Sequence, residues 1–366
     1  MPCGSIAGVH VGNEVIATGR MASVAVGEGL IGRVVDGFGK PIDKLGALAV
    51  EQEYPIHPEP VNPLSRQHIE AFLETGILTI DGLLSLGKGQ RVGIFAGSGV
   101  GKSTLLGLIA KRVNVDVNVI ALIGERGREV LDFIDQILGD DGMKKSVIVV
   151  AGADQPALVR VHAAYTAMTI AEYFRDKGKD VLLTMDSLTR FAMAQREIGL
   201  AVGEPPTSRG YTPSTFEKIP RLAERAGNFS GKGSITGIFT VLVEGDDFNE
   251  PISDHSRAIL DGHIMLTRKL ANLGVFPAID VLQSTSRLKR TVLSAAEYEL
   301  SSKALQTLGR YEELRDSIEL GVYKKGEDVK SDRVIDFERR FSEFRIQKDT
   351  QDGSRRRVFD WLAKNI

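Results

Sequence analysis

The sequence has very little cysteine: Cys3 is the only one among 366 residues, so no disulfide can form within the chain. It also lacks any apolar run that approaches the ~20 residues a membrane-spanning helix needs. Its N-terminus shows neither a charged leader nor a long apolar core, so we expect no signal peptide. These absences predict a reducing, cytosolic environment and only peripheral contact with a membrane.

The sequence also has no large excess of charge of either sign, because its 46 lysines and arginines nearly balance its 48 aspartates and glutamates, for a net charge of -2. This balance disfavours a globally basic nucleic-acid binder, although a local basic channel is compatible with it. Hydrophobic residues make up 42% of the chain, which is ordinary for a globular protein, and the length allows two or three domains.

The most informative motif is AGSGVGKST at Ala96–Thr104, which lies between two apolar runs. Strand, glycine-rich loop and helix in this order form the context of a phosphate-binding P-loop. The glycines let backbone N–H groups approach phosphate oxygens, Lys102 places a charge near the β- and γ-phosphates, and Ser103 offers a hydroxyl to Mg²⁺. The helix that follows directs its N-terminus at the anion. A chance glycine-rich turn is the alternative, which GKS between two apolar runs disfavours.

From about residue 64 to residue 288, apolar runs alternate with amphipathic stretches. This alternation predicts an α/β fold with a mainly parallel sheet covered on both faces, in which ligands bind at the carboxyl ends of the strands. The expected strands are 91–95, 117–123, 146–150, 181–185, 234–243 and 278–282. The expected helical stretches include 130–138, 156–175, 187–198, 295–320 and 332–366.

The composition divides the chain into three expected domains. Residues 1–53 are rich in glycine and valine, with a hairpin-type turn at Asp36-Gly37, and predict a partial N-terminal β-barrel domain. A connector marked by prolines opens the second expected domain, 54–290, which contains the P-loop. Strand signals fade after it, so we expect residues 291–366 to form a C-terminal helical domain.

Two groups of polar residues follow expected strands. Asp186 ends an apolar strand two strand–helix units after the P-loop, where a carboxylate organises Mg²⁺, usually through water ligands. The alternative is that Asp186 caps the next helix. Glu125 and Arg126 follow the strand after the P-loop helix, where the carboxylate can polarise the attacking water and the arginine can reach the γ-phosphate. A solvated, charged loop explains these two residues equally well.

Two further candidates flank the last expected strand. Arg287, just after it, can bind the chain's own nucleotide or reach a neighbouring subunit's nucleotide as an arginine finger. Phe276, just before it, can stack on adenine or be an ordinary core residue. The spacing alone leaves both pairs of alternatives open.

Three segments carry a resemblance to a known family: GERGREV at 124–130, the segment 181–227 that begins VLLTMDSLTRF, and the segment 233–288 that ends DVLQSTSRL. They resemble the ATPases of type III secretion, which are related to the catalytic subunit of rotary F-type ATP synthases. The resemblance runs from about residue 27 to the C-terminus and implies a RecA-like P-loop NTPase core. RFAMAQREIGLA, at 190–201, is more similar to the flagellar export ATPase than to the injectisome version.

The resemblance implies a role for each candidate. Glu125 is implied to activate water, Arg126 to contact the γ-phosphate, Arg190 to line the cleft, and Arg287 to reach across the subunit interface. With Lys102 these are the implied catalytic residues, while Ser103 and Asp186 are implied to serve Mg²⁺. The implied nucleotide-binding residues are Gly97, Ser98, Gly99, Val100, Gly101, Lys102, Ser103, Thr104 beside the α-phosphate, and Phe276 on adenine.

By the same resemblance, the chain hydrolyses ATP with Mg²⁺ in a homohexameric ring that energises flagellar protein export at the cytoplasmic face of the bacterial plasma membrane. The implied partners are a peripheral-stalk-like negative regulator, a central-stalk-like coiled-coil protein, the membrane export gate, export substrates and their chaperones, with no specific nucleic acid. A single chain that carries Lys102, Glu125 and Arg287 fits a homomeric ring, because each subunit then supplies a half-site and a finger for its neighbour.

Three other functions use the same motifs. A catalytic subunit of a rotary F/V-type ATP synthase or proton pump would alternate with a non-catalytic homologue. A hexameric nucleic-acid translocase would be stimulated by RNA or DNA. A nucleotide-binding scaffold without hydrolysis is disfavoured by the intact set of Lys102, Glu125, Asp186 and Arg287.

The N-terminus departs from the family pattern. Family members carry a complete β-barrel, preceded by a short segment that binds a regulator and the membrane. Here the barrel begins midway, near Gly8, which predicts a truncated or naturally abbreviated form.

Overall fold

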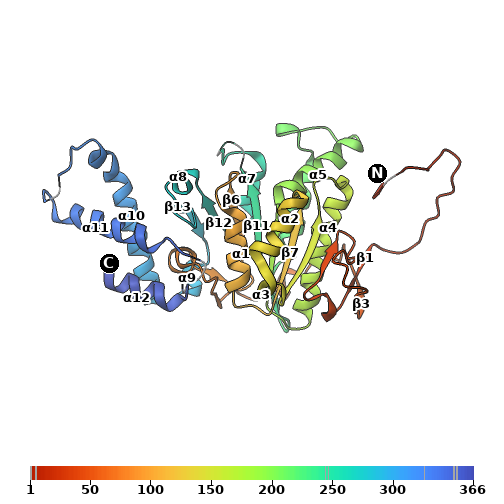
Figure 1. Ribbon diagram of the computed structural model, residues 1–366, viewed down its shortest axis with the longest axis horizontal. Coiled ribbons are helices and arrows are strands. Elements are labelled where there is room, and N and C mark those ends of the chain that lie inside the picture. Colours follow the sequence, from red (N-terminus) through yellow and green to blue (C-terminus); the bar gives the residue numbers. More distant parts are fainter. Residues whose placement is uncertain are drawn as a thin grey trace.

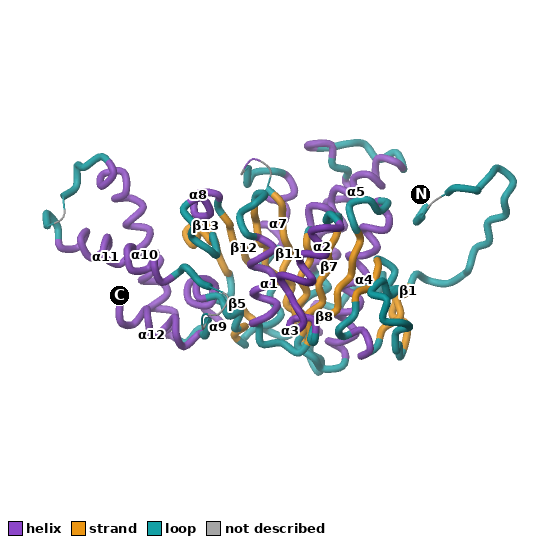
Figure 2. Tube along the Cα trace, viewed as in Figure 1, coloured by secondary structure: helices purple, strands orange, loops and turns teal. Residues whose placement is uncertain are grey.

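The chain folds around one large sheet, seen in a computed structural model that describes residues 2–4, 6–243, 245, 247–324, 326–348, 351 and 353–366. The nine-stranded sheet has the order β13-β12-β6-β11-β9-β7-β8-β2, with β10 paired to β11 (Figures 1 and 2). Neighbours from β12 to β2 run parallel, whereas β13 is antiparallel to β12 and β10 to β11. The predicted α/β fold with a mainly parallel sheet is confirmed.

The strands of this sheet are β2 (Val34–Asp36), β6 (Arg91–Ala96), β7 (Val117–Ile123), β8 (Ser146–Ala151), β9 (Val181–Asp186), β10 (Gly227–Asn228), β11 (Ser234–Leu242), β12 (Gly262–Leu266) and β13 (Ile279–Ser286). The helices that accompany them are α1 (Lys102–Arg112), α2 (Gly127–Asp132), α3 (Gly139–Met143), α4 (Ala157–Asp176), α5 (Leu188–Ala201), α6 (Pro213–Ala223), α7 (Pro251–Ile259), α8 (Arg268–Asn272) and α9 (Lys289–Val292).

The sheet is buried on both faces, which explains its continuous apolar strands. All seven residues of β7 are buried, and successive side chains point to opposite faces. Val119 packs in one core with Phe174 of α4 and residues of α5. Ile120 packs in the other with Leu106 of α1, and this second core continues into the C-terminal helices.

The chain ends build two smaller regions at opposite ends of the molecule (Figure 1). The strands β1 (Ser23–Val26) and β3 (Gln52–Pro55) pair as a separate antiparallel sheet, while β2 between them joins the edge of the large sheet. Three helices, α10 (Ala295–Glu319), α11 (Val329–Phe344) and α12 (Arg355–Asn365), form the other region. No described helix is long and apolar enough to cross a membrane.

Most expected elements lie close to their predicted bounds, and the differences have local causes. The strand β12, GHIML, was missed because five residues that include a histidine carry too short a pattern. The expected helix 130–138 is observed as α2 followed by a π-helical turn, Phe133–Leu138. The stretch 332–366 is not one helix but α11 and α12, because the chain between them packs on Gly76: a Cβ on Gly353 would lie 1.9 Å from the Gly76 carbonyl oxygen.

Candidate active site

The phosphate loop connects the end of β6 to the start of α1, as its sequence predicts. Gly99 and Gly101 have φ values of 76° and 88°, in the left-handed region that favours glycine. Gly101 is the N-cap residue of α1, so the first N–H groups of the helix are directed at the loop. Leu105 and Leu106 anchor the helix in the second core, which fixes the loop against the sheet.

Lys102 lies between two carboxylates from neighbouring strand ends. Its ammonium group forms an ion pair with Asp186 at the end of β9, and a longer one, 3.8 Å from Nζ to Oε1, with Glu125 after β7. All three side chains are largely buried, with exposed fractions of 12%, 4% and 14% for Lys102, Asp186 and Glu125. The phosphate loop and the two carboxylates predicted from strand ends therefore form one cluster.

Asp186 does not cap the helix that follows it. That role belongs to Ser187, whose Oγ accepts a hydrogen bond of 3.2 Å from the Arg190 backbone N–H. Asp186 Oδ1 instead accepts a hydrogen bond of 2.7 Å from the Thr240 hydroxyl on β11. The helix-cap interpretation of Asp186 is therefore wrong, and its carboxylate is held in the cluster.

The Thr240 contact was not predicted from the sequence. Its signal is a hydroxyl residue in the otherwise apolar strand SITGIFTVL. In the observed register Phe239 pairs with Met185, so Thr240 comes next to Asp186. This hydroxyl indicates a site residue only once β11 and β9 are known to be neighbouring strands.

Glu125 has a pKa raised to about 7, first by burial and then by the charge of Asp186, while Lys102 opposes the rise. A hydrogen bond with Glu129 contributes in the same direction and lowers the pKa of Glu129. A carboxyl group with a pKa near neutral can exchange a proton with water at the pH where enzymes work, as a general base must.

Arg126 points away from the cluster. Its side chain is 80% exposed and forms a 3.5 Å ion pair with Glu129 in the first turn of α2. The structure thus separates the two residues of the motif: Glu125 lies beside Lys102, whereas Arg126 has the solvated position that the charged-loop interpretation describes.

Arg190 lines a cavity of about 460 Å³ that opens beside the phosphate loop. Its side chain packs on Gly124, where an added Cβ would come within 3.1 Å of the Arg190 Cβ. Its Nε is buried and has no hydrogen-bond partner among the described residues. Further arginines that line the cavity were not singled out from the sequence, because their spacing forms no motif; they are Arg196, Arg209 and Arg268.

Phe276 is not a core residue, because 43% of its surface is exposed. Its ring lies against the last glycine of the phosphate loop: a Cβ added to Gly101 would lie 3.3 Å from Phe276 Cδ1. The Phe276 carbonyl accepts a 2.9 Å hydrogen bond from the backbone N–H of Gln347, which follows α11. The Phe276 ring is therefore exposed and lies beside the phosphate loop.

Arg287 and the phosphate loop lie at opposite ends of the parallel strands: the loop follows the end of β6, whereas Arg287 lies near its start. Because β13 runs antiparallel, its first residue, Ile279, lies level with Ala96, while its last, Ser286, lies level with Val92. Four residues of strand separate these levels by about 13 Å. The Arg287 guanidinium is exposed and donates to the Arg257 carbonyl at 3.4 Å. This position favours a neighbouring subunit's nucleotide over the chain's own as the target of Arg287.

Two protein families match the chain over adjoining segments. Residues 76–286 match the ATP synthase alpha/beta family, nucleotide-binding domain, and residues 293–364 match the T3SS EscN ATPase C-terminal domain. The flagellum-specific ATP synthase of Bacillus subtilis (strain 168) is 53% identical over 339 residues, which cover 92% of this chain and 77% of the relative. The type 3 secretion system ATPase of Xanthomonas euvesicatoria is 49% identical over 335 residues, 92% of this chain and 76% of the relative.

Solved structures agree with these relatives. A prototypical ATPase from the type III secretion system of pathogenic bacteria superposes with a TM-score of 0.88 at 46% identity, over 94% of this chain and 99% of that one. The assembled ATPase EscN from enteropathogenic E. coli gives a TM-score of 0.89 at 45% identity, over 93% of this chain and 83% of that one. EscN has also been solved in complex with its central stalk EscO, with a TM-score of 0.87 at 45% identity, over 94% and 83% of the two chains.

Proposed function

The chain belongs to the ATP synthase alpha/beta family, in its flagellar and type III secretion branch, and is thus an ATPase of protein export; we propose that it hydrolyses ATP in a ring whose sites are completed by neighbouring subunits. The observation that carries the proposal is the division of the catalytic residues. The cluster of Lys102, Glu125 and Asp186 lies at the carboxyl ends of the parallel strands, while Arg287 lies near their amino ends.

Ser103 and Asp186 fit the Mg²⁺ that ATPases of this kind use. A hydroxyl and a carboxylate are hard oxygen ligands, and Mg²⁺ takes one or two such protein ligands together with phosphates and waters. The described residues include no group of three or more histidine, cysteine, aspartate or glutamate side chains that could hold a metal ion without phosphates. When bound, the ion would neutralise charge on the phosphate oxygens.

The side chains of the cluster then have separate tasks. Lys102 turns from Asp186 to the β- and γ-phosphates of ATP, and the loop N–H groups bind the same oxygens. Glu125 takes a proton from water as the water oxygen bonds to the γ-phosphorus and the bond to the bridging oxygen of ADP breaks. ADP and inorganic phosphate are the products, and Arg190 lines the cavity beside the phosphate loop. Arg126, exposed before the first residue of α2, contacts the γ-phosphate only if its side chain turns from Glu129 toward the cluster.

Two observations support assembly and export as the setting of this reaction. Arg287 is exposed and beyond reach of its own phosphate loop, so it is available to a neighbouring subunit's nucleotide. The match of residues 293–364 to the C-terminal domain of EscN favours an export ATPase over a rotary synthase subunit. We propose a homohexamer with Mg²⁺-ATP sites between subunits, a central-stalk partner, and a peripheral position at the membrane beneath the export gate.

Glu125→Gln is expected to keep ATP binding and to lower the turnover number about 10²-fold. The amide keeps the shape of the side chain and can still orient water, but it cannot accept the proton, so the loss lies at the lower end of general-base effects. ATP affinity by equilibrium binding and turnover by phosphate release measure the two quantities. Asp132→Asn on α2, an exposed carboxylate paired with Arg128, is the control and should retain full turnover. Lost affinity with normal turnover per bound ATP would make Glu125 a structural residue.

Phe276→Ala is expected to weaken ATP binding by about 1–2 kcal/mol, because it removes the ring that would stack on adenine. Turnover at saturating ATP should remain nearly unchanged, since the ring touches no reacting atom. Leu273→Ala, which truncates an exposed apolar side chain nearby, should leave affinity as it is. The KM for ATP and the unfolding temperature of the variant are the measurements. A lower unfolding temperature with an unchanged KM would show that Phe276 contributes to packing and not to ATP binding.

A further inference from the structure

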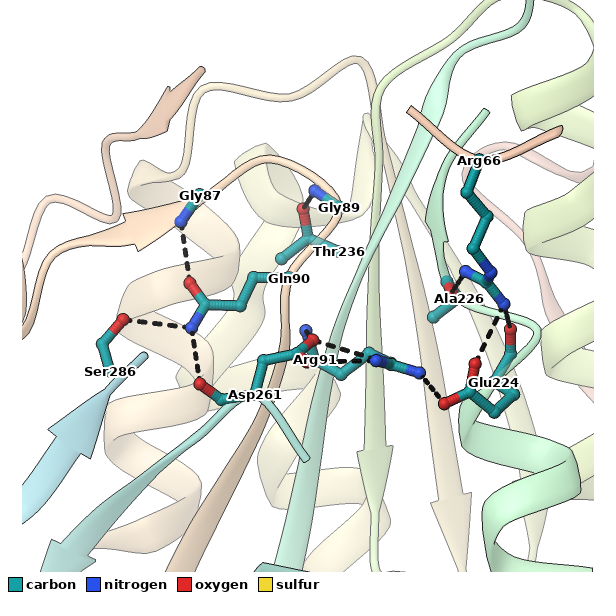
Figure 3. Close-up of polar contacts among 10 residues, drawn as sticks. All are labelled: Arg66, Gly87, Gly89, Gln90, Arg91, Glu224, Ala226, Thr236, Asp261 and Ser286. Atoms are coloured by element: carbon teal, nitrogen blue, oxygen red, sulfur yellow. Dashed lines mark hydrogen bonds and ion pairs between the residues drawn. The ribbon is translucent and has the colours of Figure 1, made fainter. Parts of the chain in front are cut away.

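A polar network around the buried Gln90 side chain holds the segment that presents Arg287 (Figure 3). It lies at the amino ends of the parallel strands, away from the phosphate loop, around Gln90 and Arg91 at the start of β6. Figure 3 shows that its members come from distant parts of the chain: the start of β6, the turn before β12, the end of β13, and the segment after α6.

Gln90 is fully buried and uses every polar atom of its side chain. Its Oε1 accepts a 2.9 Å hydrogen bond from the Gly87 N–H. Its Nε2 donates to the Ser286 hydroxyl at 3.0 Å and to the Asp261 carbonyl at 3.2 Å. The Gln90 amide therefore links Ser286, the residue before Arg287, to the backbone carbonyl of Asp261. The same carbonyl accepts a 3.0 Å hydrogen bond from the Arg287 backbone N–H.

Asp261 is in turn held by a bidentate ion pair. Arg91 donates from Nε to Oδ2 and from Nη2 to Oδ1, each at 3.0 Å, and its backbone N–H also donates to Oδ2 at 3.0 Å. Arg91 also pairs with Glu224, whose other carboxylate oxygen accepts a 3.1 Å hydrogen bond from Arg66. The carbonyl of Asp261 is thus fixed from the side of β6 and cannot shift without breaking several hydrogen bonds.

We propose that Gln90 is a positioning residue for Arg287, setting the place from which that arginine reaches the neighbouring subunit's nucleotide. The proposal rests on the trans-acting role of Arg287 proposed above. The network fixes the backbone of Arg287 through Asp261 and Ser286, while the exposed guanidinium makes one long hydrogen bond, of 3.4 Å, to the part of the chain that the structure describes. Because a misplacement of about 1 Å costs a catalytic group about 10²-fold in rate, the anchoring of its backbone bears directly on turnover.

The test uses mixed rings of two inactive variants, so that a working site needs one chain of each kind. Lys102→Ala keeps Arg287 and serves as the finger donor; Arg287→Ala keeps the phosphate loop and serves as the loop donor. Recovered ATPase activity in the mixture measures the interfaces between them. If mixed rings form and recover nothing at any ratio, the trans-acting role fails and this proposal fails with it.

Gln90→Met is then placed in one donor at a time. In the finger donor it should lower the recovered rate at least about tenfold with an unchanged KM for ATP; in the loop donor it should change the rate less than about threefold. A merely structural role would weaken both placements alike. Equal losses, or a larger loss in the loop donor, would overturn the proposal.

Two further variants keep the test decisive. Thr236→Val is the matched control, because the Thr236 hydroxyl accepts a 2.8 Å hydrogen bond from Gly89 in the same turn but touches neither Ser286 nor Asp261; its effect should not depend on the donor. Ser286→Ala removes one partner of Gln90 and the 3.0 Å hydrogen bond from the Ser286 hydroxyl to the Ser85 carbonyl, but it leaves the hydrogen bond between Gly87 and Gln90 in place. It should reproduce the placement dependence, with about a fivefold loss in the finger donor, and it decides the question if Gln90→Met does not fold. A Ser286→Ala effect that is independent of placement counts against the proposal.

Discussion

Lys102→Ala is expected to lower ATP turnover by more than about 10³-fold. The ammonium group sits in a cluster of largely buried side chains, where a unit charge acting over 4 Å is worth about 4 kcal/mol at an effective dielectric constant of 20. Alanine also leaves the carboxylates of Asp186 and Glu125 facing each other without a cation between them. Since Lys102 lowers the pKa of Glu125, its removal raises that pKa further and leaves less carboxylate to accept a proton at neutral pH.

Phosphate release at saturating ATP, together with nucleotide binding, measures this loss. Lys111→Ala is a suitable control because Lys111 is an exposed lysine in the last turn of the same helix, α1. It should turn over ATP normally. If Lys102→Ala retained wild-type turnover, the assignment of the phosphate loop would be wrong.

The phosphate loop could be predicted from the sequence because its information is local. The AGSGVGKST motif predicts a strand, a tight turn and a helix that follow one another directly, as β6 and α1 do. Asp186 was placed by the rule that ligands bind where parallel strands end, and the neighbouring strands β7 and β9 obey that rule. The pairing of Lys102 with both carboxylates follows from this topology rather than from the spacing of the residues.

The sequence could not specify the direction of the last strand. Arg287 follows an apolar run like the others, and only the pairing of β13 with β12 shows that this run is antiparallel. Because β13 is reversed, its last residue lies where the parallel strands begin, and this position favours the interpretation of Arg287 as a residue that acts on a neighbouring subunit. The same limit applies to Gln90 and Asp261, because the side chains Arg91 and Ser286 and the Asp261 carbonyl that they contact are 170 to 196 residues away in the chain.

Arg287→Ala is expected to bind ATP normally and to hydrolyse it about 10³–10⁵-fold more slowly, the effect of an arginine finger in related phosphoryl transfer. The loss should fall on turnover, because Arg287 lies about 13 Å or more along the sheet from the chain's own phosphate loop. Arg290→Ala, an exposed arginine in α9 three residues further along, is the control and should retain activity.

The dependence of specific activity on protein concentration gives the sharper measurement. In the wild-type protein it should rise with concentration, because a dilute subunit has Lys102, Glu125 and Asp186 in place but no guanidinium near its γ-phosphate, and assembly supplies one. Arg287→Ala should lose this rise, since its assembled sites lack the same group as its monomers. The rise would be absent from the wild type if Arg287 served its own subunit, and diluted protein would then be as active per chain as concentrated protein. That result would contradict the trans-acting role, whatever the activity of the alanine variant.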